Sequence, residues 1–192
     1  MSLQGVPIEK VERFVYLGQV IQLSRNHTSE ISKGISSAWN SYRKVGALLT
    51  HRLTDMSLKR KVFHMCILPI LLYGCEAWCL TKEAQSKLMR CQRSMERRML
   101  GICLRDHVRH EDIRARTGLK DVCKEAKKRK WKYMEKMQLR REEGRWDQRL
   151  MDWTPPYKRP LGRPRLRWTD DFRKHHGLRW RDLTLTRQWN PD

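Results

Sequence analysis

The chain lacks a long apolar run and a secretory leader. Its longest apolar stretch, Cys66–Cys75, has about half the residues that a membrane-spanning helix needs. Residues 1–10 contain no basic segment followed by an apolar one, which is the pattern of a signal peptide. Charged residues make up 33% of the chain and the mean hydropathy is −0.79. We therefore expect no membrane partner and a nuclear or cytoplasmic location.

Close cysteine pairs are also missing. The six cysteines contain no Cys-x2-Cys knuckle, and four of them fall at apolar positions of expected helices: Cys66, Cys75, Cys91 and Cys103. Free cysteine is one of the most buried residue types, and a disulfide framework belongs to secreted chains. The spacing favours reduced, structural cysteines and no metal site, with a zinc-binding module as an alternative.

The sequence has no recognisable catalytic motif. It contains no Gly-rich phosphate loop, no Gly-x-Ser-x-Gly and no His-Glu-x-x-His. Asp170-Asp171 is the one adjacent aspartate pair, and it stands at the start of an expected short helix, where acidic residues stabilise the helix dipole. From the missing motifs and the position of the aspartate pair we expect no catalytic residues, no cofactor and no small-molecule substrate.

Basic residues are abundant where acidic ones are few. The chain has 42 Lys plus Arg against 21 Asp plus Glu, which gives a formal charge of +21 over 192 residues. Residues 1–96 hold 14 basic and 7 acidic side chains, so two thirds of the net charge lies in residues 97–192. Such a charge favours an anionic partner, and we consider nucleic acid, an acidic membrane surface and an acidic protein.

The hydrophobic pattern predicts a mainly α-helical chain with a short N-terminal β-hairpin. The hairpin is expected over Val11–Leu23, where β-branched and aromatic residues flank Gly18. A helix capped by Ser29 follows and extends to Leu49.

A second helix is expected from about Ser57 to Trp78, capped by Asp55 or Ser57. Pro69 interrupts it, because proline removes a backbone donor and clashes with the preceding turn. The run Ile67–Tyr73 is apolar on every side and is predicted to be the most buried segment.

A third helix, Lys82–Ile102, has the clearest pattern, with arginines opposite an apolar stripe made of Leu88, Cys91, Met95, Met99 and Ile102. A short helix over Glu111–Arg116 comes next. A long basic helix over Lys120–Arg141 has its expected apolar face at Val122, Ala126, Tyr133 and Met137. Residues 144–166 are predicted to be an extended basic linker, and 168–189 a loosely attached tail with short helices.

Basic side chains on these elements are the candidate nucleic-acid ligands, because they neutralise phosphates and release counterions. The predicted residues are Arg90, Arg93, Arg97, Arg98, Lys124, Lys128, Lys132, Lys158, Arg159, Arg163, Arg165 and Arg167. Eight tryptophans, five of them after residue 140, could stack on bases. The alternative is that the charged faces are merely solvated and that the tryptophans belong to the core.

Several short strings resemble, in order, the C-terminal part of reverse transcriptases from non-LTR (LINE) retrotransposons, particularly the RTE-like group. They begin with Phe14–Gly18, Glu30-Ile31, Ala38-Trp39, Ile67–Trp78 and Met95–Ile102. They continue with Arg105-Asp106, Val108-Arg109, Arg145-Trp146, Trp153, Lys158-Arg159, Gly162-Arg163-Pro164, Arg167-Trp168, Asp170-Asp171, Trp180 and Trp189. The family pattern is not followed at Trp131, where the usual Trp-x-x-x-Gly-His is absent, nor at Thr184 and Thr186. These departures indicate a decayed or truncated copy of the element.

The resemblance implies a division of the chain. Residues 1–28 would be a primer-grip-like hairpin at the end of the palm, 29–104 a helical thumb, 105–143 a basic helical region and 144–192 a Pro/Arg/Trp-rich tail. The catalytic aspartates and the Mg²⁺ of the family belong to a palm that precedes these residues.

The resemblance therefore implies a non-catalytic fragment of an RNA-directed DNA polymerase. Its partners would be RNA and DNA, as a primer-template duplex or target DNA, bound without sequence specificity. The alternative is a stand-alone basic nucleic-acid-binding or scaffold protein derived from such an element.

Overall fold

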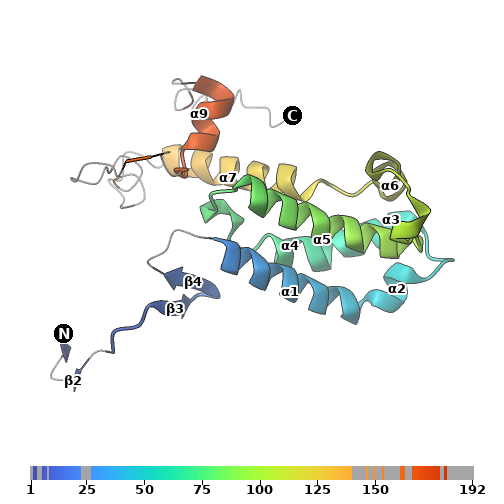
Figure 1. Ribbon diagram of the computed structural model, residues 1–192, viewed down its shortest axis with the longest axis horizontal. Coiled ribbons are helices and arrows are strands. Elements are labelled where there is room, and N and C mark those ends of the chain that lie inside the picture. The colour runs from blue at the N-terminus through green and yellow to red at the C-terminus, as the bar shows by residue number, and fades with distance from the viewer. Residues whose placement is uncertain are drawn as a thin grey trace.

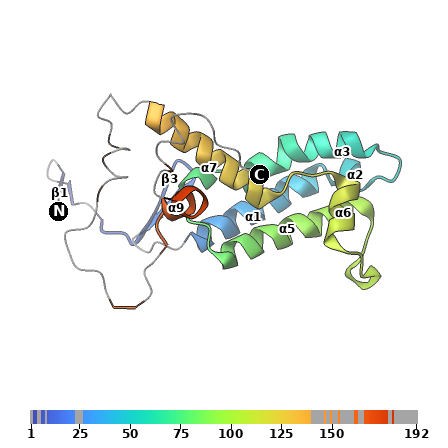
Figure 2. The same cartoon turned by 90° about the horizontal axis from the view of Figure 1, so that it is seen from above.

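The computed structural model is mainly α-helical, as the sequence predicts. It describes residues 2–3, 6–7, 9–22, 27–139, 161–162 and 166–177, together with Trp146, Arg149, Trp153 and Trp180. Helices α1 (Thr28–Lys44), α3 (Met56–Val62) and α5 (Lys82–Leu100) run side by side and form the body of the molecule (Figures 1 and 2). Helix α7 (Val122–Leu139) extends from this body towards the end where the N-terminal strands lie.

The predicted hairpin is formed by β3 (Arg13–Tyr16) and β4 (Gln19–Gln22), which pair antiparallel. Leu17 and Gly18 make the turn with φ angles of 47° and 80°. Two positive φ angles are typical of the two-residue turns whose twist matches that of the strands. Another antiparallel pair, which the sequence did not predict, precedes this hairpin: β1 (Ser2–Leu3) and β2 (Val6–Pro7).

The helical body holds the tip of the hairpin in place. The Tyr73 hydroxyl donates to the Leu17 carbonyl at 2.8 Å, and Lys33 Nζ donates to the Gly18 carbonyl at 2.8 Å. The strands themselves are open to solvent, since Phe14 is 57% exposed. Among the strands that the structure describes, β3 pairs with β4 alone, and the Val20 N–H of β4 donates to a Glu30 carboxylate oxygen at 2.9 Å.

The first long helix is shorter than predicted. Helix α1 ends at Lys44, and a separate short helix, α2 (Gly46–Thr50), follows Val45. The first helix begins after His27, so the predicted cap Ser29 lies inside the first turn, and that prediction was wrong. The buried face of α1 includes Ile31, Ala38 and Tyr42.

Pro69 interrupts the second helix, as predicted. Helix α3, capped by Asp55, continues into a π-helical turn, Phe63–Ile67, before α4 (Leu68–Leu71). Because the ring of Pro69 would clash with the carbonyl of an ordinary preceding turn, the wider π turn makes room for it.

The helix stops at Leu71, short of the predicted Trp78, because the chain turns at Gly74 with a φ of 71° into a 3-10 turn, Cys75–Ala77. The run around Pro69 is not buried all round, since Ile70 is 38% and Tyr73 57% exposed.

Helix α5 follows its prediction closely. The Thr81 side chain accepts a hydrogen bond from the Ala84 N–H, and Gly101 ends the helix in the left-handed conformation. Leu88, Cys91, Met95 and Met99 of the predicted stripe are buried and belong to the main core. Ile102, which was predicted on the same stripe, lies beyond the end of the helix and is only partly buried. Two polar residues that were not predicted to be inside, Gln92 and Glu96, are buried beside it.

Helices α6 (His110–Thr117), α7 and α9 (Asp170–His176) complete the described chain. The buried face of α7 includes Trp131 and Met134, whereas the predicted Tyr133 is 42% exposed. The reason is a second small core, separate from the main one, that α7 builds with the tail. None of the helices that the structure describes is long and apolar enough to cross a bilayer.

Candidate nucleic-acid interface

The predicted arginines of α5 do not form one open face. Arg90 and Arg98 are exposed, and the Arg98 guanidinium lies 4.8 Å from the centre of the Trp39 ring. Arg93 and Arg97 are only partly exposed and lie close enough to His110 of α6 for their charge to lower its pKa, after the larger effect of desolvation. Helix α6 packs against α5 here, so the predicted arginine stripe is divided by a covering helix.

The three predicted lysines of α7 form a continuous row. Lys124, Lys128 and Lys132 are all exposed and follow one another at intervals of four residues. At a rise of about 1.5 Å per residue, successive lysines of the row are about 6 Å apart along the helix axis. In the described part of the chain, the ion pairs of α7 use Arg129 and Lys130 and leave this lysine row unpaired.

A buried ion pair fixes the described part of the tail to α7. Lys130 Nζ lies 2.7 Å from a carboxylate oxygen of Asp171 and donates to the Trp78 carbonyl at 3.2 Å. The aspartate pair does stand at a helix start, as predicted, but Asp171 also neutralises a lysine that is only 2% exposed. Residues 166–177 are therefore not loosely attached, and that prediction was wrong.

Aromatic side chains build the second core at this junction. Phe172 packs edge-to-face on Trp131 at 4.5 Å between ring centres and stacks on Trp180 at 5.4 Å. Trp168 packs against Phe172 and donates from Nε1 to the Glu76 carbonyl at 2.7 Å. These tryptophans are structural, in agreement with the alternative reading of them as core residues.

Two other tryptophans remain open to solvent. Trp146 is 74% exposed and Trp153 57% exposed. Arg167 is partly exposed, and its backbone N–H donates to an Asp170 carboxylate oxygen. The other predicted tail ligands lie outside the described residues: Lys158, Arg159, Arg163 and Arg165.

Of the six cysteines, Cys75, Cys91 and Cys123 are buried, Cys66 and Cys79 are partly exposed, and Cys103 is exposed. Burial raises the pKa of Cys75 and Cys91 to about 12 and that of Cys123 to about 11, so their thiols stay protonated. Cys103 was predicted at an apolar helix position but is exposed, because α5 has already ended at Gly101. Among the described residues, no three His, Cys, Asp or Glu side chains lie together in a way that could hold a metal ion.

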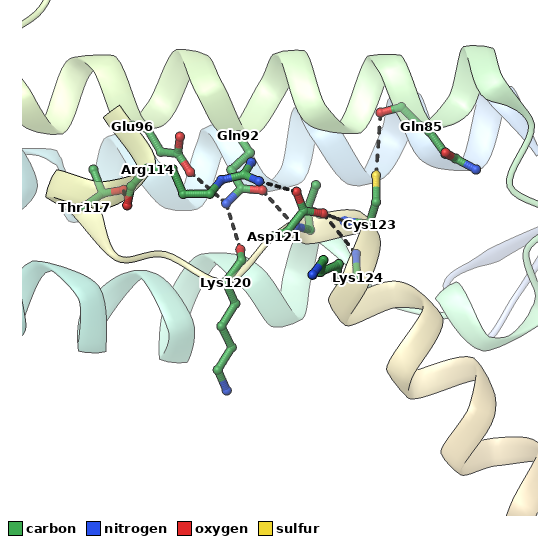
Figure 3. A network of polar contacts seen from close by, with 10 residues as sticks. Gln85, Gln92, Glu96, Arg114, Thr117, Lys120, Asp121, Cys123 and Lys124 are labelled. Carbon is green, nitrogen blue, oxygen red and sulfur yellow. Dashed lines mark hydrogen bonds and ion pairs between the residues drawn. The ribbon is translucent and has the colours of Figure 1, made fainter. Parts of the chain in front are cut away.

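A polar network at the start of α7, which the sequence did not reveal, positions the lysine row (Figure 3). Gln92 donates to Glu96 and to the Lys120 carbonyl, both at 2.8 Å, and accepts a hydrogen bond from the Val122 N–H at 2.8 Å. Asp121 caps the helix by accepting from the N–H groups of residues 123 and 124. A single buried glutamine in a basic helix does not stand out in the hydrophobic pattern, so the sequence could not predict these hydrogen bonds between α5 and the start of α7.

A hollow of about 440 Å³ adjoins the lysine row on α7. Arg129, Lys132 and Lys136 line it from the helix. Gln19 of β4 and Glu76 of the 3-10 turn line the facing wall. Lys132 therefore belongs both to the lysine row and to this concave surface.

The chain resembles one known protein over most of its length. It is 31% identical over 188 residues to a Caenorhabditis elegans protein described as "Putative uncharacterized transposon-derived protein F52C9.6". The match covers 95% of this chain and 67% of that protein. No family model and no solved structure matches the chain.

Proposed function

Because the chain belongs to a family of transposon-derived proteins, we propose that it is the thumb and C-terminal part of a non-LTR retrotransposon reverse transcriptase. In this role it binds an RNA/DNA duplex or target DNA through the phosphates and carries no catalytic residues of its own. The resemblance of its strings to the RTE-like group supports the assignment. Polymerisation would require the palm of the complete enzyme, with its aspartates and Mg²⁺.

The lysine row of α7 is the observation that carries the proposal. Exposed ammonium groups without carboxylate partners are available to phosphates, whereas paired ones are already neutralised. The row sits on a helix that is fixed at one end by the Gln92 network and along its length by the Lys130–Asp171 pair. A row of lysines on a fixed helix is suited to a regular backbone, since on binding only the side chains, and not the helix that carries them, have to be ordered.

The arginines of α5 take unequal parts in this interface. Arg90 and Arg98 are exposed and are positioned to add phosphate contacts. Arg93 is screened by α6, and its Nε atom is buried with no hydrogen-bond partner in the described part of the chain. We assign the larger share of binding to the lysine row and a smaller share to Arg90 and Arg98.

Backbone contacts position a protein on a duplex but carry no sequence information. The experiment is a fluorescence anisotropy titration of the whole chain against labelled RNA/DNA hybrids and DNA duplexes, each in two unrelated sequences. We expect the two sequences of each duplex type to give equal dissociation constants. We also expect binding to both duplex types to weaken steeply as the salt concentration is raised. A marked preference for one sequence, or no binding at low salt, would contradict the proposal.

A further inference from the structure

We propose that the hollow between α7, β4 and the 3-10 turn binds one unpaired nucleotide at the end of a nucleic-acid strand, an inference that rests on the proposed function. Its volume of about 440 Å³ falls within the range of roughly 300–1,000 Å³ found for small-ligand pockets. The walls supply both groups that a nucleotide needs, which are cations for the phosphate and an aromatic face for the base.

The cationic wall comes from one face of α7. Arg129, Lys132 and Lys136 follow one another at spacings of three and four residues, so their side chains project to the same side of the helix. Arg129 is partly neutralised, because its Nε atom lies 3.5 Å from Glu125 Oε1. Lys132 and Lys136 are exposed and belong to no ion pair among the described residues, so the phosphate would lie against these two.

Tyr133 supplies the aromatic face from the same helix. It lines the hollow and is 42% exposed, so part of its ring is open to a ligand. Trp168 holds the ring edge-to-face, with 6.4 Å between the ring centres and 88° between the planes. Because Trp168 is itself tied to the Glu76 carbonyl, the platform is fixed before a base arrives.

The facing wall carries polar groups that orient the nucleotide. The Glu76 carboxylate repels a phosphate and accepts hydrogen bonds from a sugar hydroxyl or a base amino group. The Gln19 amide both donates and accepts. Gly74 leaves room for this amide, since a Cβ there would overlap the Gln19 side chain, and its φ of 71° suits glycine.

These walls select an unpaired nucleotide over a paired one. A base inside a duplex is stacked on both faces and bonded along its pairing edge, so it cannot reach Tyr133 without leaving the helix. A base in a single-stranded overhang is free to stack on an aromatic side chain. The lysine row would hold the duplex while the hollow takes the first nucleotide beyond it, with Lys132 shared between the two surfaces.

The test compares binding to a blunt duplex with binding to the same duplex carrying a short overhang labelled with 2-aminopurine. For the wild type we expect the overhang to tighten binding roughly fivefold or more and the 2-aminopurine fluorescence to fall on stacking. Tyr133→Ala should abolish both effects, and Tyr133→Phe should keep both. Lys136→Gln should reduce the gain in affinity that the overhang gives. The matched control Lys124→Gln should weaken binding to the blunt duplex and to the overhang duplex by the same factor.

The outcomes separate this inference from the proposed function. If no duplex is bound at all, the proposed function is wrong and the hollow loses its role with it. If the blunt duplex is bound but the overhang adds nothing, or if Tyr133→Ala keeps the full advantage and the fluorescence change, the hollow does not bind a nucleotide and the inference is overturned.

Discussion

Gln92 shows how one buried side chain can position a whole element. Its amide connects α5 to Lys120 and to Val122, the first residue of α7, through two hydrogen bonds, and a third hydrogen bond, to Glu96, lies within α5 (Figure 3). The helical pattern predicted the apolar neighbours of Gln92 but not its burial, because a polar residue beside an apolar stripe normally faces solvent. Its role depends on a contact that is distant in sequence.

Glu96, the neighbour of Gln92, makes stability depend on pH. Burial raises its pKa above the usual 4.5, and this effect exceeds the opposing effects of Arg114 and the hydrogen bond from Gln92. Between the unfolded and the folded pKa the folded state binds more protons than the unfolded state, so stability falls as the pH rises through this window.

Glu96→Gln should therefore be more stable than the wild type at neutral pH, with a difference that shrinks towards zero as the pH falls below 4.5. Chemical denaturation of both proteins at a series of pH values measures the difference in their free energies of unfolding. The other titrating groups are the same in both proteins, so their contributions cancel in this difference. The exposed Glu83, paired with Lys87 one turn along α5, provides the control. If Glu83→Gln shows the same pH-dependent gain, or if Glu96→Gln is less stable at neutral pH, this account of Glu96 is wrong.

Among the elements, α5 was the easiest to predict and the tail the hardest. Helix α5 has a capping threonine, an unbroken apolar stripe and a terminal glycine, and each of these signals is local. The attachment of α9 depends instead on a lysine and an aspartate that are far apart in the sequence. Tyr133 was misplaced for the same reason, since the packing of the tail decides which side of α7 is covered.

The junction of α7 and α9 should depend on the Lys130–Asp171 pair. Asp171→Asn leaves the Lys130 ammonium group buried without a carboxylate, and we expect a loss of about 2–3 kcal/mol in the free energy of unfolding, less than for a fully buried pair because Asp171 is partly exposed. Chemical denaturation followed by tryptophan fluorescence measures the loss, since tryptophans line this core.

A double variant separates the charge from the packing. Replacing both partners, as Lys130→Met with Asp171→Leu, removes the two charges together and should recover most of the lost stability. If Asp171→Asn has no measurable effect, the pair does not hold the tail. If the double variant is less stable than the single one, the pair contributes more than charge neutralisation.

At the scale of the whole molecule, only some of the basic side chains behind the net charge of +21 are available to bind an anionic partner. Part of it is paired or buried, as at Lys130 and Arg114, and part is only partly exposed where α6 packs on α5, as at Arg93 and Arg97. Composition alone predicted a nucleic-acid partner but could not distinguish these groups, because pairing and burial depend on tertiary contacts. The structure leaves the lysine row of α7 as the longest continuous run of exposed, unpaired predicted ligands among the described residues.

The salt dependence of duplex binding tests the lysine row most directly. Each lysine that neutralises a phosphate adds about 0.9 to the slope of log K against log salt concentration. The measurement compares this slope for the wild type, Lys124→Gln with Lys128→Gln, and a control with Lys44→Gln and Lys61→Gln, which removes two exposed charges from other helices. The account predicts a slope shallower by about 2 for the α7 variant and an unchanged slope for the control. Equal slopes for all three proteins would contradict it.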